Sequence, residues 1–128
     1  MKIIKNEMRT PDGTILRSRN RHDYVTHTDS KNGKLYMLDG GLDYVRSSAN
    51  GDEEYLTVTT DNTHDEIREA VTWGTYGKEG DQPLSFIKLL NMETAHIQAV
   101  LQTVQGIYPP YKDAMTDELE FRGIYSEG

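Results

Sequence analysis

The sequence predicts an α+β fold: a small antiparallel β-sheet that contains a hairpin and is packed by two or three C-terminal helices. Two observations predict it. Runs of β-branched and aromatic residues separated by turn residues fill the first half of the chain. In the second half, apolar residues recur at helical spacing. The 128 residues suit a single domain, 1–128, because a boundary at the composition change near residue 63 would leave two small halves.

Turn signals divide the first half into strands. Residues 2–8 form a mixed run. Residues 11–13, Pro-Asp-Gly, predict a turn because proline presets φ and glycine accepts a positive φ. Ile15 then restarts an extended segment. Residues 42–47 fit either a short helix or a strand, and residues 54–60 are rich in β-formers and predict a further strand.

A hairpin is predicted between residues 24–28 and 34–38. Both runs are aromatic or β-branched, and Asn32-Gly33 between them is a strong short hairpin signal. A two-residue loop at Asn32-Gly33 predicts two cross-strand pairs: Asp29 opposite Tyr36, and His27 opposite Leu38.

The second half reads as helices around one strand. Residues 64–71 carry acidic side chains in their first turn and predict a helix. Residues 73–80 are expected to be a glycine-rich aromatic loop, and residues 83–90 a strand. An apolar stripe predicts a helix over 93–105, and residues 111–122 predict the last helix.

Composition excludes several classes of function. A net charge of −7 leaves no broad basic face for duplex nucleic acid. The absence of cysteine removes disulfides, thiolate catalysis and thiolate zinc sites, and no cofactor is expected. No apolar run approaches the roughly 18 residues of a membrane span, and the N-terminus lacks a signal-peptide core. The 35% hydrophobic content predicts a modest core, which favours a homo-oligomer.

Positive charge is concentrated in residues 17–29, which hold three arginines and two of the four histidines. Arginines spaced two apart converge on one side of an extended backbone and suit a phosphate or carboxylate. Tyrosine side chains nearby are able to stack on a base. The predicted ligand-binding residues are Arg17, Arg19, Arg21, His22, Tyr24 and Tyr44. The alternative is a solvated strand edge whose arginines pair with surface acids.

A metal site is an alternative interpretation of residues 17–29, with less support than binding of an anionic ligand. The adjacent His22-Asp23 pair, together with His27, could supply ligands, and Asp29 and Asp39 are expected nearby. A metal site needs three or four converging ligands. The other two histidines fall in predicted helices. We therefore predict neither a metal ion nor a catalytic residue.

Several segments together carry a resemblance. Residues 19–29 read Arg-x-Arg-His-Asp-Tyr-Val-x-His-x-Asp, and residues 73–84 read Trp-Gly-Thr-Tyr-Gly-x-x-Gly-x-x-Pro-Leu. With these motifs the chain resembles small hypothetical accessory proteins of tailed bacteriophages. Residues 89–101 and 111–122 are similar to a helical hairpin found in many short phage proteins.

The resemblance implies a protein that acts in the cytoplasm of an infected bacterial host. Some small phage proteins bind and hide the nucleotide signals of bacterial immunity. The leading hypothesis is therefore a non-enzymatic protein that binds a host factor, most specifically a nucleotide-like anionic ligand. One alternative is a protein–protein inhibitor or adaptor that uses the acidic helical half. The other is a metal-dependent phosphoesterase acting on nucleotides.

Overall fold

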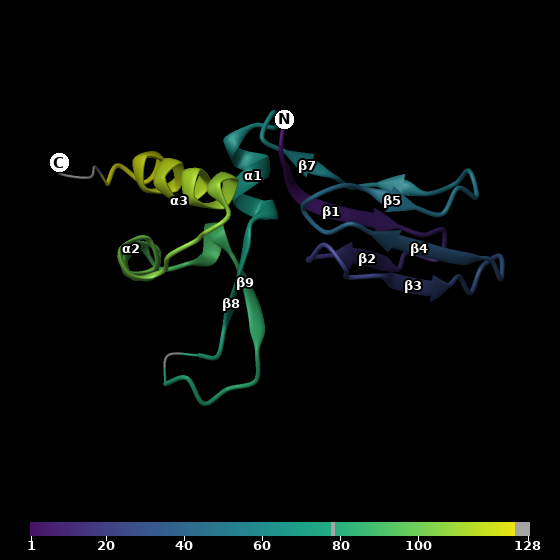
Figure 1. Ribbon diagram of the computed structural model, residues 1–128, viewed down its shortest axis with the longest axis horizontal. Helices are drawn as coiled ribbons and strands as arrows, with labels where there is room; N and C mark the ends of the chain where they lie inside the picture. Colours follow the sequence, from purple (N-terminus) through teal and green to yellow (C-terminus); the bar gives the residue numbers. More distant parts are fainter. Residues whose placement is uncertain (78, 125–128) are drawn as a thin grey trace. The chain divides into compact units, whose positions relative to one another are not determined.

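A computed structural model of the chain describes residues 1–77 and 79–124 (Figure 1). Those residues are about 27% helix and 28% strand, and all strand pairs are antiparallel, which confirms the α+β class. The chain divides into two compact units, Met1–Asp61 and Asn62–Gly128. The division falls close to the composition change near residue 63, and the expectation of a single domain stays a prediction.

The first unit contains a sheet built around β1 (Ile3–Arg9). Strand β1 lies between β2 (Ile15–Ser18) and β6 (Glu54–Tyr55) and pairs with both. It also pairs with β7 (Val58–Thr59). The continuous strand predicted over 54–60 is wrong. Two short strands form instead, and the pairing of β7 with β1 shifts register between Ile3 and Lys5.

A second sheet in the same unit has the order β3 (Val25–Thr28), β4 (Leu35–Asp39) and β5 (Arg46–Ser47). The core joins the two sheets, because Met8 and Leu16 pack in one cluster with Tyr36 and Leu38. Alternate residues of β1 point into this unit's interior, as expected for a strand with one buried face.

The β3–β4 hairpin forms as predicted, but the predicted register is wrong. His27 lies opposite Tyr36, not Leu38, and Asp29 belongs to the loop. The Asp29 carboxylate accepts the backbone N–H groups of Lys31 and Asn32 at 2.8 and 3.1 Å, which closes a longer turn before the strands meet. A two-residue loop leaves no room for this Asx-type turn.

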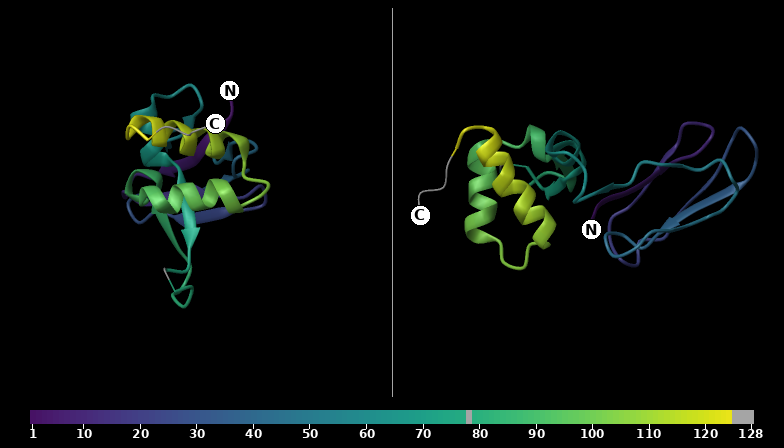
Figure 2. Two further views of the ribbon diagram at one scale, coloured as in Figure 1. Left: turned by 90° about the vertical axis from the view of Figure 1, so that its left-hand side faces the viewer. Right: turned by 90° about the horizontal axis from the view of Figure 1, so that it is seen from above.

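The second unit begins with α1 (His64–Ala70), a hairpin of β8 (Thr72–Thr75) and β9 (Ser85–Lys88), and the short 3₁₀ helix η1 (Leu89–Asn91). Two longer helices follow, α2 (Thr94–Thr103) and α3 (Pro109–Phe121). Figure 2 shows α2 and α3 side by side, whereas Figure 1 shows the β8–β9 hairpin extending away from them. The buried apolar residues of this unit are Ala70, Val71, Leu89, Met92, Ile97, Val100, Ala114, Met115 and Leu119.

Two expectations for this unit need correction. Residues 73–80 were expected to form a loop, but Thr72–Thr75 is strand β8, because its β-forming residues find a partner in Ser85–Lys88. Residue 78 of the predicted loop lies outside the described residues. The last helix was expected over 111–122, but α3 begins two residues earlier, because Pro109 and Pro110 form its first turn, where a missing N–H loses no hydrogen bond within the helix.

No helix within residues 1–77 and 79–124 is long and apolar enough to cross a bilayer.

Candidate functional site

Two loops of the first unit pack against each other and carry most of the predicted ligand-binding residues. We call them the paired loops: residues 19–24, which connect β2 to β3, and residues 40–45, which connect β4 to β5. The second loop approaches the first closely at Gly41, which has a φ of 55°. A Cβ atom built on Gly41 would overlap the backbone of Asn20 and Arg21, so only glycine fits there.

A buried asparagine on β1 holds the second of the paired loops. The Asn6 side chain is fully buried, and its amide nitrogen donates to the carbonyls of Asp39 at 3.1 Å, Gly41 at 3.0 Å and Tyr44 at 3.2 Å. The amide oxygen of Asn6 is also buried and accepts no hydrogen bond from any residue that the structure describes. The Asn6 amide therefore holds the carbonyl of Asp39, the last residue of β4, together with the carbonyls of two loop residues.

Ser18 at the end of β2 links the two loops directly. Its buried hydroxyl donates to the Asp23 carbonyl at 2.7 Å and accepts the Gly41 N–H at 2.9 Å. The Asp23 carboxylate accepts the Arg19 N–H at 2.9 Å, which closes the first loop on itself. These bonds give the paired loops a defined backbone conformation without a core of their own.

Five of the six predicted ligand-binding residues lie in the paired loops. The side chains of His22, Tyr24 and Tyr44 are exposed, Arg19 is partly buried, and Arg21 is 67% exposed. Arg21 pairs with Asp43 at 3.6 Å, also on this surface. The structure thus brings Tyr44 to the arginine-rich loop although more than twenty positions separate it from Arg21 in the sequence.

Arg17 does not share this surface. It lies on β2 opposite Glu7, its carboxylate partner at 3.8 Å, and its side chain is only 17% exposed. The predicted extended run from Arg17 to Arg21 is wrong, because β2 ends at Ser18 and the chain turns at Asn20, where the Asp23 N–H donates to the Asn20 carbonyl.

The metal candidates fall elsewhere. Among the described residues, the group with metal-ligand spacing is Asp12, His27 and Asp29, whose ligand atoms lie within 4.8 Å of one another. It includes His27 of the three predicted candidates, but not His22 or Asp23. Asp39, expected nearby, instead caps the Gly40 N–H and pairs with Arg46.

Protein donors already occupy the carboxylates of this group. Asp12 accepts His27 at 2.8 Å and the Ser30 N–H at 2.9 Å, and Asp29 accepts the Asp12 N–H at 2.8 Å. The hydrogen bonds from Ser30, Thr14 and His27 outweigh burial and hold the pKa of Asp12 well below its usual range. The arrangement ties the 10–14 turn to the β3–β4 loop through hydrogen bonds.

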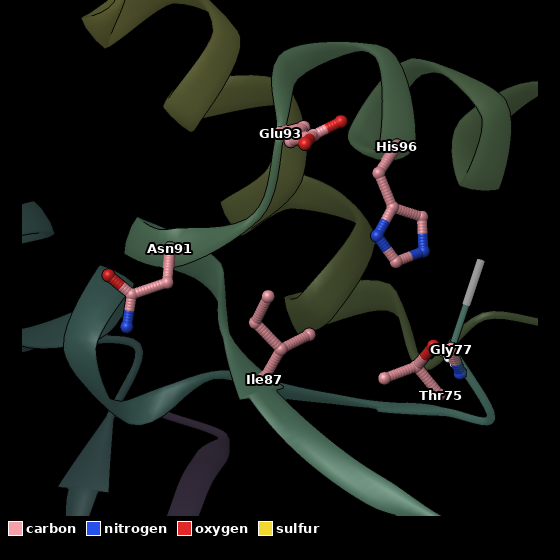
Figure 3. A pocket seen from close by; sticks show the side chains of 6 residues that line it. All are labelled: Thr75, Gly77, Ile87, Asn91, Glu93 and His96. Atoms are coloured by element: carbon pink, nitrogen blue, oxygen red, sulfur yellow. Dashed lines mark hydrogen bonds between the residues drawn. The ribbon is translucent and has the colours of Figure 1, made fainter. Parts of the chain in front are cut away.

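The second unit has a pocket of about 410 Å³ beside its hairpin. Figure 3 shows the His96 ring and the Ile87 side chain at this pocket, with Glu93 at the start of α2. The remaining lining residues are Thr75, Gly77 and Asn91. His96, one of the two histidines that the sequence places in a helix, is partly exposed on α2 and lines the pocket.

A buried ion network holds the helices of the second unit together. Glu118 is fully buried and accepts Arg68 at 2.8 Å, Arg122 at 2.7 Å and His64 at 3.0 Å. Arg122 also donates to the Met92 and Leu89 carbonyls at 2.8 and 3.1 Å. Burial raises the pKa of Glu118, but the bonds from Arg68, Arg122 and His64 outweigh it and lower the pKa to about 2.

Sequence reasoning found the exposed residues of the paired loops but missed what holds them. Asn6 and Ser18 are polar residues at positions where strand alternation points inward, in step with the buried Met8 and Leu16. A polar residue at a strand position whose neighbours two residues away are buried and apolar is the sequence signal that could have identified Asn6 and Ser18.

In comparisons with protein-family models, curated proteins and solved structures, we found no match to this chain.

Proposed function

We propose that this protein is a non-enzymatic accessory protein of a tailed bacteriophage, and that it binds a host factor through the paired loops. The observation that carries the proposal is the buried Asn6–Ser18 network, which holds an exposed group of arginine, histidine and tyrosine side chains. The resemblance to small phage proteins supports the phage origin and, with it, action in the host cytoplasm.

The chemistry of the paired loops suits recognition. Tyrosine and arginine are the residues that dominate binding energy at protein surfaces, because they offer large contact areas together with hydrogen-bonding groups. Tyr24 and Tyr44 present their rings at the surface, and Arg21 stands beside them. A loop whose backbone is fixed beforehand loses less entropy when a ligand binds.

The more specific form of the proposal is a nucleotide-like ligand. The phosphate of the ligand would replace Asp43 as the ion-pair partner of Arg21. An ion pair as exposed as Arg21–Asp43 contributes only about 0–1 kcal/mol, so breaking it costs little free energy. Tyr24 or Tyr44 would stack on the base. Arg19 lies in the same loop as Arg21, whereas Arg17 lies on β2 and pairs with Glu7.

Titration calorimetry with cyclic di-GMP, cyclic AMP and ATP tests this form. We expect one of these probes to bind, and the Arg21→Ala and Tyr44→Ala variants to weaken binding at least about tenfold, which is about 1.4 kcal/mol for each lost contact. Arg9→Ala is the matched control, since Arg9 is also an exposed arginine paired with a carboxylate, that of Glu54.

Two results count against the nucleotide form: silence with all three probes, or an equal loss in the Arg9→Ala control. If the probes are silent, the broader proposal is tested by capturing a purified host protein on the wild type but not on the Tyr24→Ala/Tyr44→Ala variant. Equal capture by both proteins would refute binding through the paired loops.

A further inference from the structure

Acidic charge is concentrated in the second unit. Residues 62–128 hold 11 acidic and 5 basic residues, a formal net charge of −6, whereas residues 1–61 hold 10 and 9, a net charge of −1. Both arginines of the second unit, Arg68 and Arg122, are directed at buried Glu118. With Arg68, Arg122 and Glu118 set aside, residues 62–128 hold ten acidic residues and three lysines, and one of these lysines, Lys88, pairs with Glu69 at 3.5 Å.

An apolar surface projects from the same unit. On one face of the β8–β9 hairpin, Tyr76, Leu84 and Phe86 are 56, 52 and 48% exposed. Gly74 leaves this face open between them, because a Cβ there would meet Leu84 at 3.2 Å and Phe86 at 3.5 Å. In Figure 1 the hairpin extends away from the helices of its unit.

The hairpin is a two-stranded sheet, with no third strand beside it among the residues that the structure describes. A two-stranded hairpin is marginally stable alone in water, and a third strand is the usual remedy. An extended partner segment completes such a sheet through main-chain hydrogen bonds, while its side chains supply specificity.

The two faces of the hairpin differ in chemistry. Tyr76, Leu84 and Phe86 form the apolar face, whereas Thr75 and Ile87 point to the pocket that also contains Glu93 and His96. Because side chains of an added strand alternate between the two faces, one set would meet the apolar side chains and the other the pocket.

We propose that the β8–β9 hairpin binds an extended segment of a partner protein in which apolar and basic residues alternate. The apolar residues pack on Leu84 and Phe86, and the basic residues face Glu93 on the pocket side. Charge complementarity selects this partner, because the unit carries a net charge of −6 with its arginines turned inward. The inference uses no residue of the paired loops and stands independently of their function.

A peptide of alternating lysine and valine, about eight residues long to match an ordinary strand, is the probe. Trp73 is the sole tryptophan and lies on β8 opposite Ile87, so its fluorescence reports binding. We expect Phe86→Ser to weaken binding at least about tenfold through lost apolar contact. Glu93→Gln should weaken it about threefold and reduce its salt dependence. The matched control is Val104→Ser, which alters an exposed apolar residue (40%) at the end of α2.

Several outcomes overturn the inference. They are failure of the lysine–valine peptide to bind the wild type, equal binding of a glutamate–valine peptide of the same length, and equal weakening by Val104→Ser. A fourth is self-association: if sedimentation shows that the wild type is a dimer and Phe86→Ser is a monomer, a second copy of the chain occupies the hairpin. The variants change exposed side chains, and circular dichroism checks that they fold.

Discussion

Replacing Glu118 by glutamine tests the account of the second unit most directly. The substitution keeps the size of the side chain and removes its charge, while Arg68, Arg122 and His64 remain pointed at it. Arg68 and Arg122 have side chains only 23 and 19% exposed, so both cations stay largely out of water without a counter-ion. Breaking a buried ion pair from one side costs about 3–5 kcal/mol.

The lowered pKa gives an independent magnitude. In the folded protein the pKa of Glu118 falls from 4.5 to about 2. At about 1.4 kcal/mol for each pH unit, ionised Glu118 contributes about 3 kcal/mol to the free energy of unfolding. Because the pKa is lower in the folded state, this contribution is complete above pH 4.5 and is lost as the pH falls toward 2. Less than half of it, about 1.4 kcal/mol, remains at about pH 3.

Urea denaturation followed by Trp73 fluorescence measures both quantities, since Trp73 lies in the same unit as Glu118. We expect Glu118→Gln to lower the free energy of unfolding by about 3 kcal/mol at neutral pH, and by less than half as much at about pH 3. Glu120→Gln, two positions along α3 on its exposed side, is the control and should cost less than about 0.5 kcal/mol. A Glu118→Gln cost below about 1 kcal/mol, or one that does not change with pH, would refute the reasoning.

Two predictions concern the first unit, with amide hydrogen exchange at Ile4 as the measure of its stability. Gly33 and Gly41 both have a positive φ, but only Gly41 has backbone atoms where a Cβ would go. Gly33→Ala should therefore lower the free energy of unfolding by about 1 kcal/mol. Gly41→Ala should lower it by about 1–3 kcal/mol more, because the backbone near Asn20 must move. Equal losses in the two variants would contradict the close packing of the paired loops. Asn6→Ala leaves three carbonyls without their donor and should cost about 2 kcal/mol; a cost below about 0.5 kcal/mol would show that the loops keep their shape without it.

Local signals predicted the fold class well, and side-chain hydrogen bonds explain where they failed. The helix starting at His64 and the strand at Ser85 follow from capping and β-propensity, which act over a few residues. The β3–β4 register failed because the carboxylate of Asp29 bonds the loop backbone, a choice that composition does not reveal. Strand β8 was not predicted because Gly74 favours a loop by local propensity. The strand forms through its pairing with β9, in which Gly74 lies opposite Phe86.

The candidate site was predictable only in part for a related reason. Neighbouring positions in the chain placed His22 and Tyr24 beside Arg21, so a sequence pattern was enough to group them. The contribution of Tyr44 required the close approach at Gly41, which is a contact between loops distant in sequence. The exclusion of Arg17 required its cross-strand neighbour Glu7, which became apparent only when β1 and β2 were paired.

Two buried polar residues among those that the structure describes, Glu118 and Asn6, differ in a way that bears on the proposed function. Both oxygens of Glu118 accept hydrogen bonds from arginine side chains, which link α3 to α1. Asn6 gives its amide hydrogens to loop carbonyls while its own buried oxygen accepts no bond within the described residues, which costs about 1–3 kcal/mol. The amide nitrogen of Asn6 secures the backbone of the second of the paired loops, and this is why we propose that the exposed side chains of these loops bind a partner.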